Sequence, residues 1–209
     1  MLTNTTFHRL QDRMQGPLPG KDAQFRMAHL ARRGDFPVPE TARKAGVLAM
    51  FYPNAHGHWH LALIERVPHD NDRHGGQISF PGGKFETEDG TLMRTALRET
   101  REEIGVDTSA VEMLGPLTEL YIPVSNFLVH PFVGILPYTP AFSPQWEEVH
   151  SVVEAPLEQL LHPSARQVTD LQLSSNILLK DVPYFNISGK VVWGATAMML
   201  SELLEVMEG

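Results

Sequence analysis

The strongest constraint on the fold lies at residues 82–106, where a pair of glycines leads into the clearest helical pattern of the chain. Its largely apolar stripe, at spacings of four, three and four residues, consists of Met93, Leu97, Thr100 and Ile104. This spacing predicts a helix over about residues 90–104 with one buried stripe. Three glutamates, Glu99, Glu102 and Glu103, fall at i, i+3 and i+4. They therefore share a different face of that helix within one turn.

The shared face brings three carboxylates together, and like charges at this spacing repel. A divalent cation offsets that repulsion, and Mg²⁺ prefers oxygen ligands of this kind. Arg98 lies four residues before Glu102 and can pair with it, which would orient the carboxylate. Gly82 and Gly83 permit a tight turn where the backbone approaches a ligand. Glutamates at this spacing more often form a solvated face of a helix, so their spacing alone does not predict a metal site. The glycine pair before the helix and Gly105 after it are what favour a metal site here.

Strand patterns are found both before and after residues 82–106. Residues 45–52 and 58–67 are expected to form a hairpin about the turn at residues 53–57. Further strands are expected at residues 78–80, 111–122, 127–136 and 176–192. Helices are expected at residues 157–161 and 195–207. Because strands and helices mix without strict alternation, the sequence predicts an α/β (α+β) fold with layered, mixed β-sheets.

Residues 1–40 are interpreted as an N-terminal extension, and residues 41–209 as the main domain. Short helices are expected at residues 4–14 and 22–32. The proline- and glycine-rich residues 16–20 would separate them.

The charge balance narrows the class of partner. The chain of 209 residues carries a formal net charge of −8 and no basic tail, which disfavours a general nucleic-acid binder. An acidic protein that handles phosphates would need metal ions to bridge like charges. The absence of cysteine excludes disulfides, thiolate catalysis and zinc–thiolate sites. The first 14 residues lack a signal-peptide core, and no apolar run approaches the roughly 18 residues of a membrane span. We therefore expect a cytoplasmic protein without a membrane partner.

Histidines offer a second, weaker candidate for a metal site. His56, His58 and His60 alternate, so a strand would place them on one face, where they could bind zinc. The exposed side of a hairpin explains them better, because no further ligand is apparent. His69 and His74 precede the glycine turn, and His74 could lie near the site.

Residues 98–106, Arg-Glu-Thr-Arg-Glu-Glu-Ile-Gly-Val, resemble the second half of the Nudix box, R-E-U-x-E-E-x-G-U with U aliphatic. Thr100 takes one of the aliphatic positions. The first half of the box, G-x5-E-x7, is similar from Gly83 to Asp89, with one added residue before the second half. An aspartate and one added residue resemble the coenzyme A pyrophosphatase branch of the family. Residues 76–86 also resemble that branch, which reads G-Q-U-x-F-P-G-G-K-x-E.

The likeness to that branch continues outside the box, at residues 123–134, 148–149, 155–157 and 192–197, so that it covers about residues 45–207. Upstream of the box the branch carries two arginines. Arg66 supplies the first, whereas Val67 and Pro68 replace a Ser-Ala pair. Asp72 stands where the second arginine would fall, next to Arg73. This departure leaves the substrate open.

The resemblance implies a Nudix-type α/β/α sandwich with a mixed β-sheet and the box helix packed on it. It also implies a hydrolase in which water attacks a phosphorus of a nucleotide derivative, with Mg²⁺ or Mn²⁺ as cofactor. Glu99, Glu102 and Glu103 would be the metal ligands, and Arg98 would orient a carboxylate. One of these glutamates, or Glu148 from another loop, would act as general base.

The same resemblance implies which residues meet the substrate and what that substrate is. Arg66 and Lys84 are expected to contact phosphates beside the turn at Gly82 and Gly83. Coenzyme A or acyl-coenzyme A, cleaved to 3′,5′-ADP and (acyl-)4′-phosphopantetheine, is the first candidate. The alternatives are hydrolysis of ADP-ribose or another nucleoside diphosphate derivative, and a regulator that binds a nucleotide without cleaving it. A homodimer to which residues 1–40 contribute is also compatible, as extensions in related proteins often take part in dimers.

Overall fold

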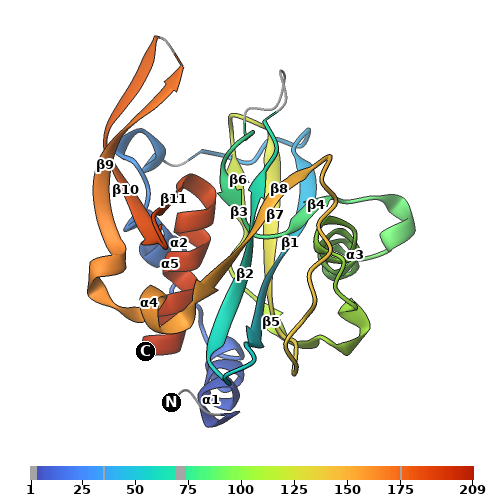
Figure 1. Ribbon diagram of the computed structural model, residues 1–209. Helices are drawn as coiled ribbons and strands as arrows, with labels where there is room; N and C mark the ends of the chain where they lie inside the picture. The colour runs from blue at the N-terminus through green and yellow to red at the C-terminus, as the bar shows by residue number, and fades with distance from the viewer. Residues whose placement is uncertain (1–3, 35, 69–73, 175) are drawn as a thin grey trace.

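A mixed eight-stranded sheet lies at the centre of the fold, with helices on both of its faces (Figure 1). The structure is a computed structural model and describes residues 4–34, 36–68, 74–174 and 176–209. The strands of the main sheet are β1 (Arg43–Pro53), β2 (Trp59–Arg66), β3 (Ile78–Ser79), β4 (Gly82–Lys84), β5 (Glu112–Pro116), β6 (Leu120–Ile122), β7 (Phe127–Ile135) and β8 (Val149–Pro156). A second sheet, in the order β11-β10-β9, consists of β9 (Arg166–Ser174), β10 (Ile177–Ile187) and β11 (Lys190–Trp193). The α-helices are α1 (Asn4–Met14), α2 (Gly20–Phe25), α3 (Leu92–Ile104), α4 (Leu157–Leu161) and α5 (Gly194–Glu208). None of the helices that the structure describes is long and apolar enough to cross a membrane.

Strand β1 organises the main sheet. One of its edges pairs in parallel with β7 along Arg43–Phe51, whereas the other strand pairs of this sheet are antiparallel. Its second edge is divided: β4 pairs with residues 45–47 and β2 pairs with residues 51–53. Between these segments the N–H of Leu48 donates to the carbonyl of Pro81 over 2.9 Å. Strand β2 therefore diverges from β1 where the glycine turn of β4 inserts.

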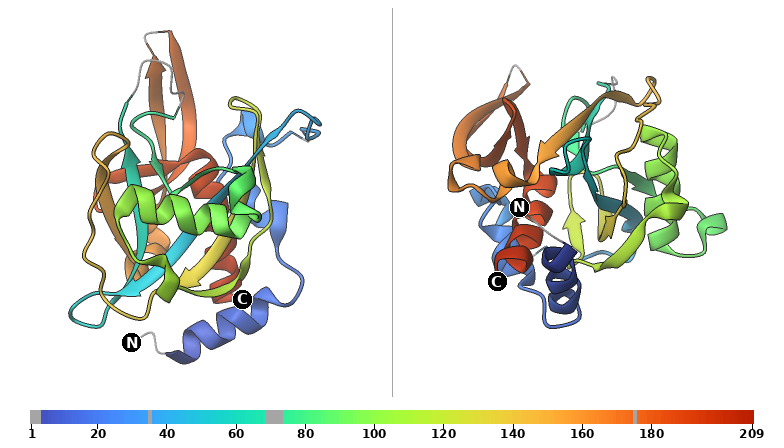
Figure 2. Two further views of the ribbon diagram at one scale, coloured as in Figure 1. Left: turned by 90° about the vertical axis from the view of Figure 1, so that its right-hand side faces the viewer. Right: turned by 60° about the horizontal axis from the view of Figure 1, so that its bottom comes forward.

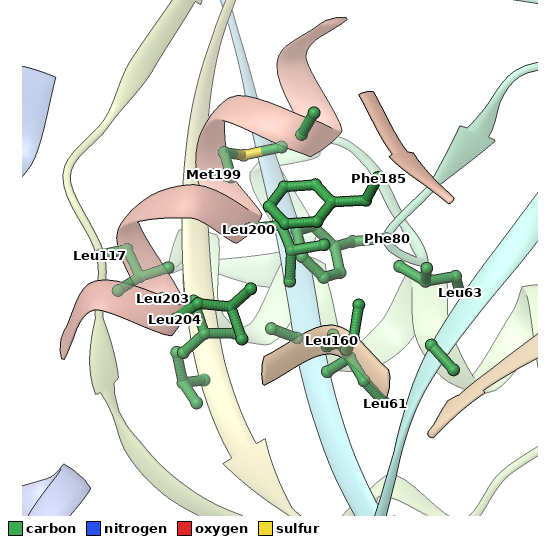
Figure 3. Close-up of a cluster of buried hydrophobic side chains, with 14 of the residues drawn as sticks. Leu61, Leu63, Phe80, Leu117, Leu160, Phe185, Met199, Leu200, Leu203 and Leu204 are labelled. Carbon is green, nitrogen blue, oxygen red and sulfur yellow. The ribbon is translucent and has the colours of Figure 1, made fainter. Parts of the chain in front are cut away.

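The two faces of the sheet bury different side chains, because neighbouring residues of a strand point to opposite faces. On β1, Leu48 and Met50 join a cluster with Ala96 and Ile104 of α3. The alternate residues of β1 belong to a larger cluster with α5. Figure 3 shows part of that cluster, in which Phe185 from the second sheet lies beside Leu200 of α5. The expected α/β sandwich with mixed strands and the box helix on one face is confirmed.

The N-terminal segment packs on the same core as the rest of the chain. Phe7 and Leu10 of α1 are buried in the cluster that contains α5. Arg13 Nη1 donates to the carbonyl of Met207 over 2.7 Å, near the C-terminal end of α5 (Figure 2). The division of the chain at residue 40 stays a prediction, but these contacts show that α1 is not a detached arm.

Several predicted elements differ from the observed ones. The helix predicted at residues 22–32 is shorter, because α2 ends at Phe25 and only a 3₁₀ turn follows at Leu30–Arg32. The strand predicted at 111–122 is divided into β5 and β6, and the one predicted at 176–192 is divided into β10 and β11. Strands β4, β8 and β9 were not predicted. The helices predicted at 4–14, 157–161 and 195–207 are confirmed by α1, α4 and α5.

The buried stripe predicted for the box helix is wrong in part. Met93 is 38% exposed, whereas Thr95 is fully buried. Thr95 takes part in the burial because α3 turns Ala96, Thr100 and Ile104 toward the sheet. The helix itself begins and ends close to the predicted limits.

The alternating histidines do not share one strand face. His56 lies in the turn, and His58 precedes β2, which begins at Trp59. Only His60 belongs to the strand. His58 lies 3.8 Å from the carboxylate of Glu158. The strand arrangement on which a zinc site at these histidines depended is therefore wrong.

Candidate active site

Two glycines allow the box helix to approach the sheet. A Cβ atom on Gly46 of β1 would lie 2.2 Å from the carbonyl oxygen of Leu92, at the first turn of α3. A Cβ atom on Gly83 of β4 would lie 2.4 Å from Cδ of Glu99. At Gly46 only a residue without a side chain fits, because the atom in the way belongs to the backbone, whereas at Gly83 a side chain would displace the Glu99 carboxylate. The carboxylate of Glu99 therefore lies directly over the backbone of β4.

Glu103 is the most deeply buried of the three box glutamates, at 2% exposure. Its Oε2 accepts a hydrogen bond from the N–H of Gly82 over 2.8 Å, and its Oε1 lies 3.5 Å from Nη1 of Arg66. Burial raises the pKa of Glu103 to about 8. The Gly82 N–H and Arg66 oppose this rise, whereas the negative charges of Glu99 and Glu148 add to it.

Glu99 and Glu102 differ from Glu103 in exposure and in partner. Burial raises the pKa of Glu99, against the nearby guanidinium of Arg98, whose Nη1 lies 3.0 Å from Oε1 of Glu99. The side chain of Glu102 is 47% exposed and accepts a hydrogen bond from the same Nη1 over 2.9 Å. The predicted pairing of Arg98 with Glu102 is therefore present. The three carboxylates are not equivalent, because α3 turns one toward the sheet and one toward solvent.

Asp89 holds Arg98 in place. Arg98 donates from Nε to Oδ1 of Asp89 over 2.7 Å and from Nη2 to Oδ2 over 3.1 Å. Oδ2 also accepts from Oγ1 of Thr95 over 2.8 Å and from the N–H of Glu86 over 3.0 Å. The guanidinium is the main reason that the pKa of Asp89 lies well below its usual range. A two-point contact fixes the plane of an arginine as well as its position, so Asp89 orients the group that contacts Glu99.

Asp89 was absent from the site residues predicted from the sequence. The available signal was its place at the end of the first half of the box, where a family glutamate is expected. Sequence spacing could not show that its partner would be Arg98, nine positions later. The eight residues between Asp89 and Arg98, one more than in the box, begin with a turn in which Gly90 has a φ of 69° and Thr91 caps α3.

Glu148 comes from a distant part of the chain, yet its negative charge raises the pKa of both Glu99 and Glu103. Backbone hydrogen bonds fix the turn that carries it. The N–H of Gln145 donates to the carbonyl of Glu103 over 3.0 Å, and the N–H of Val67 donates to the carbonyl of Glu148 over 2.9 Å. The predicted distant carboxylate is therefore placed within electrostatic reach of the box glutamates. Its side chain is exposed.

Of the remaining predicted residues, Arg66 lies in the cluster of box glutamates, whereas the side chain of Lys84 does not. Arg66 belongs to the cluster through Glu103. The carbonyl of Lys84 accepts from Nη2 of Arg98 over 3.3 Å, but the Lys84 side chain is exposed and follows Gly83 in a strand, which directs it away from the α3 face. His74 lies 3.3 Å from the Gln77 side-chain oxygen. The predictions that concern His69, Asp72 and Arg73 fall outside the described residues.

The carboxylates fit a hard divalent cation in their chemistry. Among the residues that the structure describes, no group of three or more His, Cys, Asp or Glu side chains is arranged closely enough to hold a metal ion. Burial and mutual repulsion nevertheless raise the pKa values of Glu99 and Glu103, and a cation relieves both effects. Oxygen donors alone favour Mg²⁺ or Mn²⁺ over softer metals.

Comparison with known proteins identifies the family. The model of the NUDIX domain matches residues 42–172, which is more than half of the chain. A relative named as an uncharacterized Nudix hydrolase, NudL, from Yersinia enterocolitica is 35% identical over 145 residues, which is 69% of this chain and 72% of the relative. A protein of the same name from Salmonella paratyphi B is 35% identical over 143 residues, which is 68% of this chain and 72% of the relative.

A solved structure agrees on the fold. A MutT/nudix family protein from Enterococcus faecalis superposes with a TM-score of 0.51 over 90% of this chain and 70% of that chain, at 16% identity. The chain therefore belongs to the Nudix hydrolase family, whose members act on pyrophosphate bonds. Enzymes of this family generally use divalent metal ions.

Proposed function

We propose that the protein is a metal-dependent pyrophosphohydrolase that cleaves coenzyme A or acyl-coenzyme A to 3′,5′-ADP and 4′-phosphopantetheine or its acyl form. The observation that carries the reaction is the convergence of Glu99, Glu103 and Glu148. The charge of Glu148 raises the pKa of both Glu99 and Glu103, and the charge of Glu99 also raises the pKa of Glu103. Two carboxylates with raised pKa values on α3, beside a third carboxylate from a distant segment, are typical of an active site rather than of a solvated surface.

In the proposed reaction, the chain binds a divalent cation through Glu99, Glu102 and Glu103. When bound, Mg²⁺ or Mn²⁺ neutralises the diphosphate and lowers the pKa of the attacking water. Glu148 accepts the proton of that water as general base while the new P–O bond forms. The P–O bond of the bridging oxygen breaks, and the electron pair leaves with the departing phosphate. Arg98 orients the carboxylate of Glu99 through its own contact with Asp89.

The phosphate groups of the substrate would lie between the carboxylates and the turn of β4. Arg66 is the cation nearest to this space among the predicted contacts, because it lies 3.5 Å from Glu103. Lys84 reaches phosphate only if its side chain bends round the end of β4, so its contribution is expected to be smaller.

Coenzyme A is proposed as substrate because residues 76–86 and the aspartate at position 89 both resemble the branch that cleaves it. ADP-ribose or another nucleoside diphosphate derivative is the second candidate, since the chain supplies only the first arginine of the upstream pattern, at Arg66. A regulator that binds without cleavage is disfavoured, because all three box glutamates are present.

A substrate panel tests the proposal. The protein is incubated with Mg²⁺ or Mn²⁺ and coenzyme A, ADP-ribose or a dinucleoside polyphosphate, and the products are separated by chromatography. Release of 3′,5′-ADP from coenzyme A supports the proposed substrate. Turnover of ADP-ribose with none of coenzyme A supports the second candidate, and tight binding without turnover of any compound contradicts the enzyme.

Two matched variants test the site itself. Glu103→Gln retains an acceptor for the Gly82 N–H but removes the charge, so the rate should fall by roughly 10²–10⁴-fold while the fold persists. Glu112→Gln changes an exposed glutamate on β5 and should leave the rate unchanged. Equal rates in the two variants would overturn the assignment of Glu103.

A further inference from the structure

The hairpin of β9 and β10 projects from the body of the molecule, beyond the layer that holds α5 (Figures 1 and 2). It carries Val168, Leu173, Ile177 and Leu178, which are 62%, 47%, 50% and 49% exposed. They are four of the eleven large apolar side chains that are exposed among the described residues. Single exposed apolar side chains are common on any protein surface, but four of them on one projecting hairpin favour a surface that another molecule covers.

Strand β9 is also an open edge. It is the last strand of its sheet, and no strand among the described residues pairs with its outer side. Natural proteins usually guard such edges with a lysine, a proline or a bulge near the middle of the strand. The register of the β9–β10 pair is irregular opposite Asp170 and near the tip of the hairpin, but residues 166–169 pair with β10 without interruption. The third residue of β9 is Val168, the most exposed apolar side chain of the hairpin. The edge therefore offers both unpaired backbone groups and apolar surface to an incoming strand.

The charges of β9 identify that incoming strand. Arg166, Val168 and Asp170 lie at i, i+2 and i+4, so they share one face of the strand. An antiparallel copy of β9 centred on Val168 places each Arg166 opposite an Asp170 of the second copy. Opposite charges in directly facing positions stabilise a strand pair. The pattern is thus complementary to itself when the chain direction is reversed.

Other registers of the same pair are less favourable. Centring the two strands on Thr169 places Val168 opposite Asp170, and centring them on Asp170 brings two carboxylates together, which is destabilising. Within its own chain, the Arg166 guanidinium lies 3.8 Å from Glu208 and 5.5 Å from the centroid of the Phe185 ring, and Oδ1 of Asp170 accepts from the N–H of Asp181 over 3.0 Å. We propose that β9 is the interface of a homodimer in which two copies pair antiparallel about a two-fold axis at Val168.

The absence of cysteine from the chain permits a sharp test of that axis. Directly facing residues of antiparallel strands have Cα atoms about 4.5–5.5 Å apart, which is within the range of a disulfide. Val168→Cys should therefore form a reducible covalent dimer rapidly under mild oxidation. Val124→Cys is the control, because that valine is 56% exposed but lies outside the hairpin. Equal rates of cross-linking in the two variants would overturn the proposed axis.

Charge reversal tests the register without any cross-link. Arg166→Asp or Asp170→Arg alone places like charges opposite each other twice, and each should weaken the dimer on the order of 10-fold in sedimentation equilibrium. The double variant Arg166→Asp with Asp170→Arg restores both pairs and should recover the wild-type dissociation constant. Thermal melts identify any single variant that does not fold. In that case the dissociation constant of the double variant, compared with that of the wild type, still tests the register. A monomeric wild-type protein, or a dimer that neither reversal weakens, would overturn the proposal.

Discussion

Replacing Gly83 by alanine tests whether the carboxylate of Glu99 must lie over β4. The added Cβ would be 2.4 Å from Cδ of Glu99 and 2.5 and 2.6 Å from its two oxygens, where ordinary contact begins at 3.4 Å. The carboxylate must therefore move by about 1 Å. Because it is the end of a flexible side chain, the free energy of unfolding should change by less than about 1 kcal/mol. A displacement of about 1 Å at a reacting centre can nevertheless reduce the rate by about 10²-fold.

Two other glycines make this experiment decisive. In Gly46→Ala the new Cβ meets the backbone oxygen of Leu92 at 2.2 Å, and a backbone cannot move aside, so this variant should lose several kcal/mol of stability, roughly 2–4. In Gly16→Ala the nearest atom is a backbone oxygen at 3.4 Å, so neither stability nor rate should change. The assay is kcat for cleavage of the diphosphate with Mg²⁺, together with a thermal melt of each variant. A wild-type kcat in Gly83→Ala, or a melt as low as that of Gly46→Ala, would refute the reasoning.

Three further perturbations follow from the buried polar groups. Asp89→Asn removes the carboxylate that contacts Arg98 at two points and leaves it only Glu99 and Glu102, which should cost about 3 kcal/mol at neutral pH by chemical denaturation. Because the pKa of Asp89 is lowered in the folded protein, its ion pair with Arg98 stabilises the wild type above pH about 4, and this stabilisation disappears on acidification. The stability of the variant should therefore depend less on pH in the acid range. With a pKa near 8 against an ordinary value of 4.5, Glu103 keeps a proton in the folded state that the unfolded chain loses. The stability of the metal-free protein should therefore fall as pH rises from about 5 to about 8, and an equally steep fall in Glu103→Gln would contradict this. Glu202→Ala removes one of the two acceptors of the buried Gln24 amide, the other being the carbonyl of Thr118, and should lower stability by about 2–3 kcal/mol. An unchanged melting temperature would show that the contact between Gln24 and Glu202 does not stabilise the packing of α2 on α5.

Secondary structure was predictable where one face of an element is buried. The box helix and α5 have apolar residues at helical spacing, and both were located within a few residues. Strand β9 was missed because Arg166–Ser174 lies on an exposed hairpin, so solvent and not a core faces its side chains. The predicted strand at 176–192 was divided by a turn, since Ser188 and Gly189 have φ angles of 50° and 82° that no strand adopts. These backbone angles are set by the turn and leave little trace in a hydrophobic pattern.

Most members of the candidate site were predictable from the sequence, but Asp89 and the environments of the glutamates were not. Helical spacing placed Glu99, Glu102 and Glu103 on one turn, because residues three and four apart are neighbours in any α-helix. It could not tell which carboxylate faces the sheet, since that depends on how α3 rotates over the contact at Gly46. The same rotation exposes Met93, against the prediction from the apolar stripe. Only the tertiary fold decides between these otherwise similar positions.

The charges of the site bear on how a diphosphate could enter it. The cluster contains five carboxylates and two guanidinium groups, at Asp89, Glu99, Glu102, Glu103, Glu148, Arg66 and Arg98. Arg98 is already committed to three of the carboxylates, so a bound diphosphate would meet an excess of negative charge. Like charges at such short range oppose binding strongly when water is partly excluded. If the protein acts as proposed, the cation must therefore bind before the substrate or together with it. The metal-free protein would repel the diphosphate that it cleaves. The overall net charge of −8 acts in the same direction.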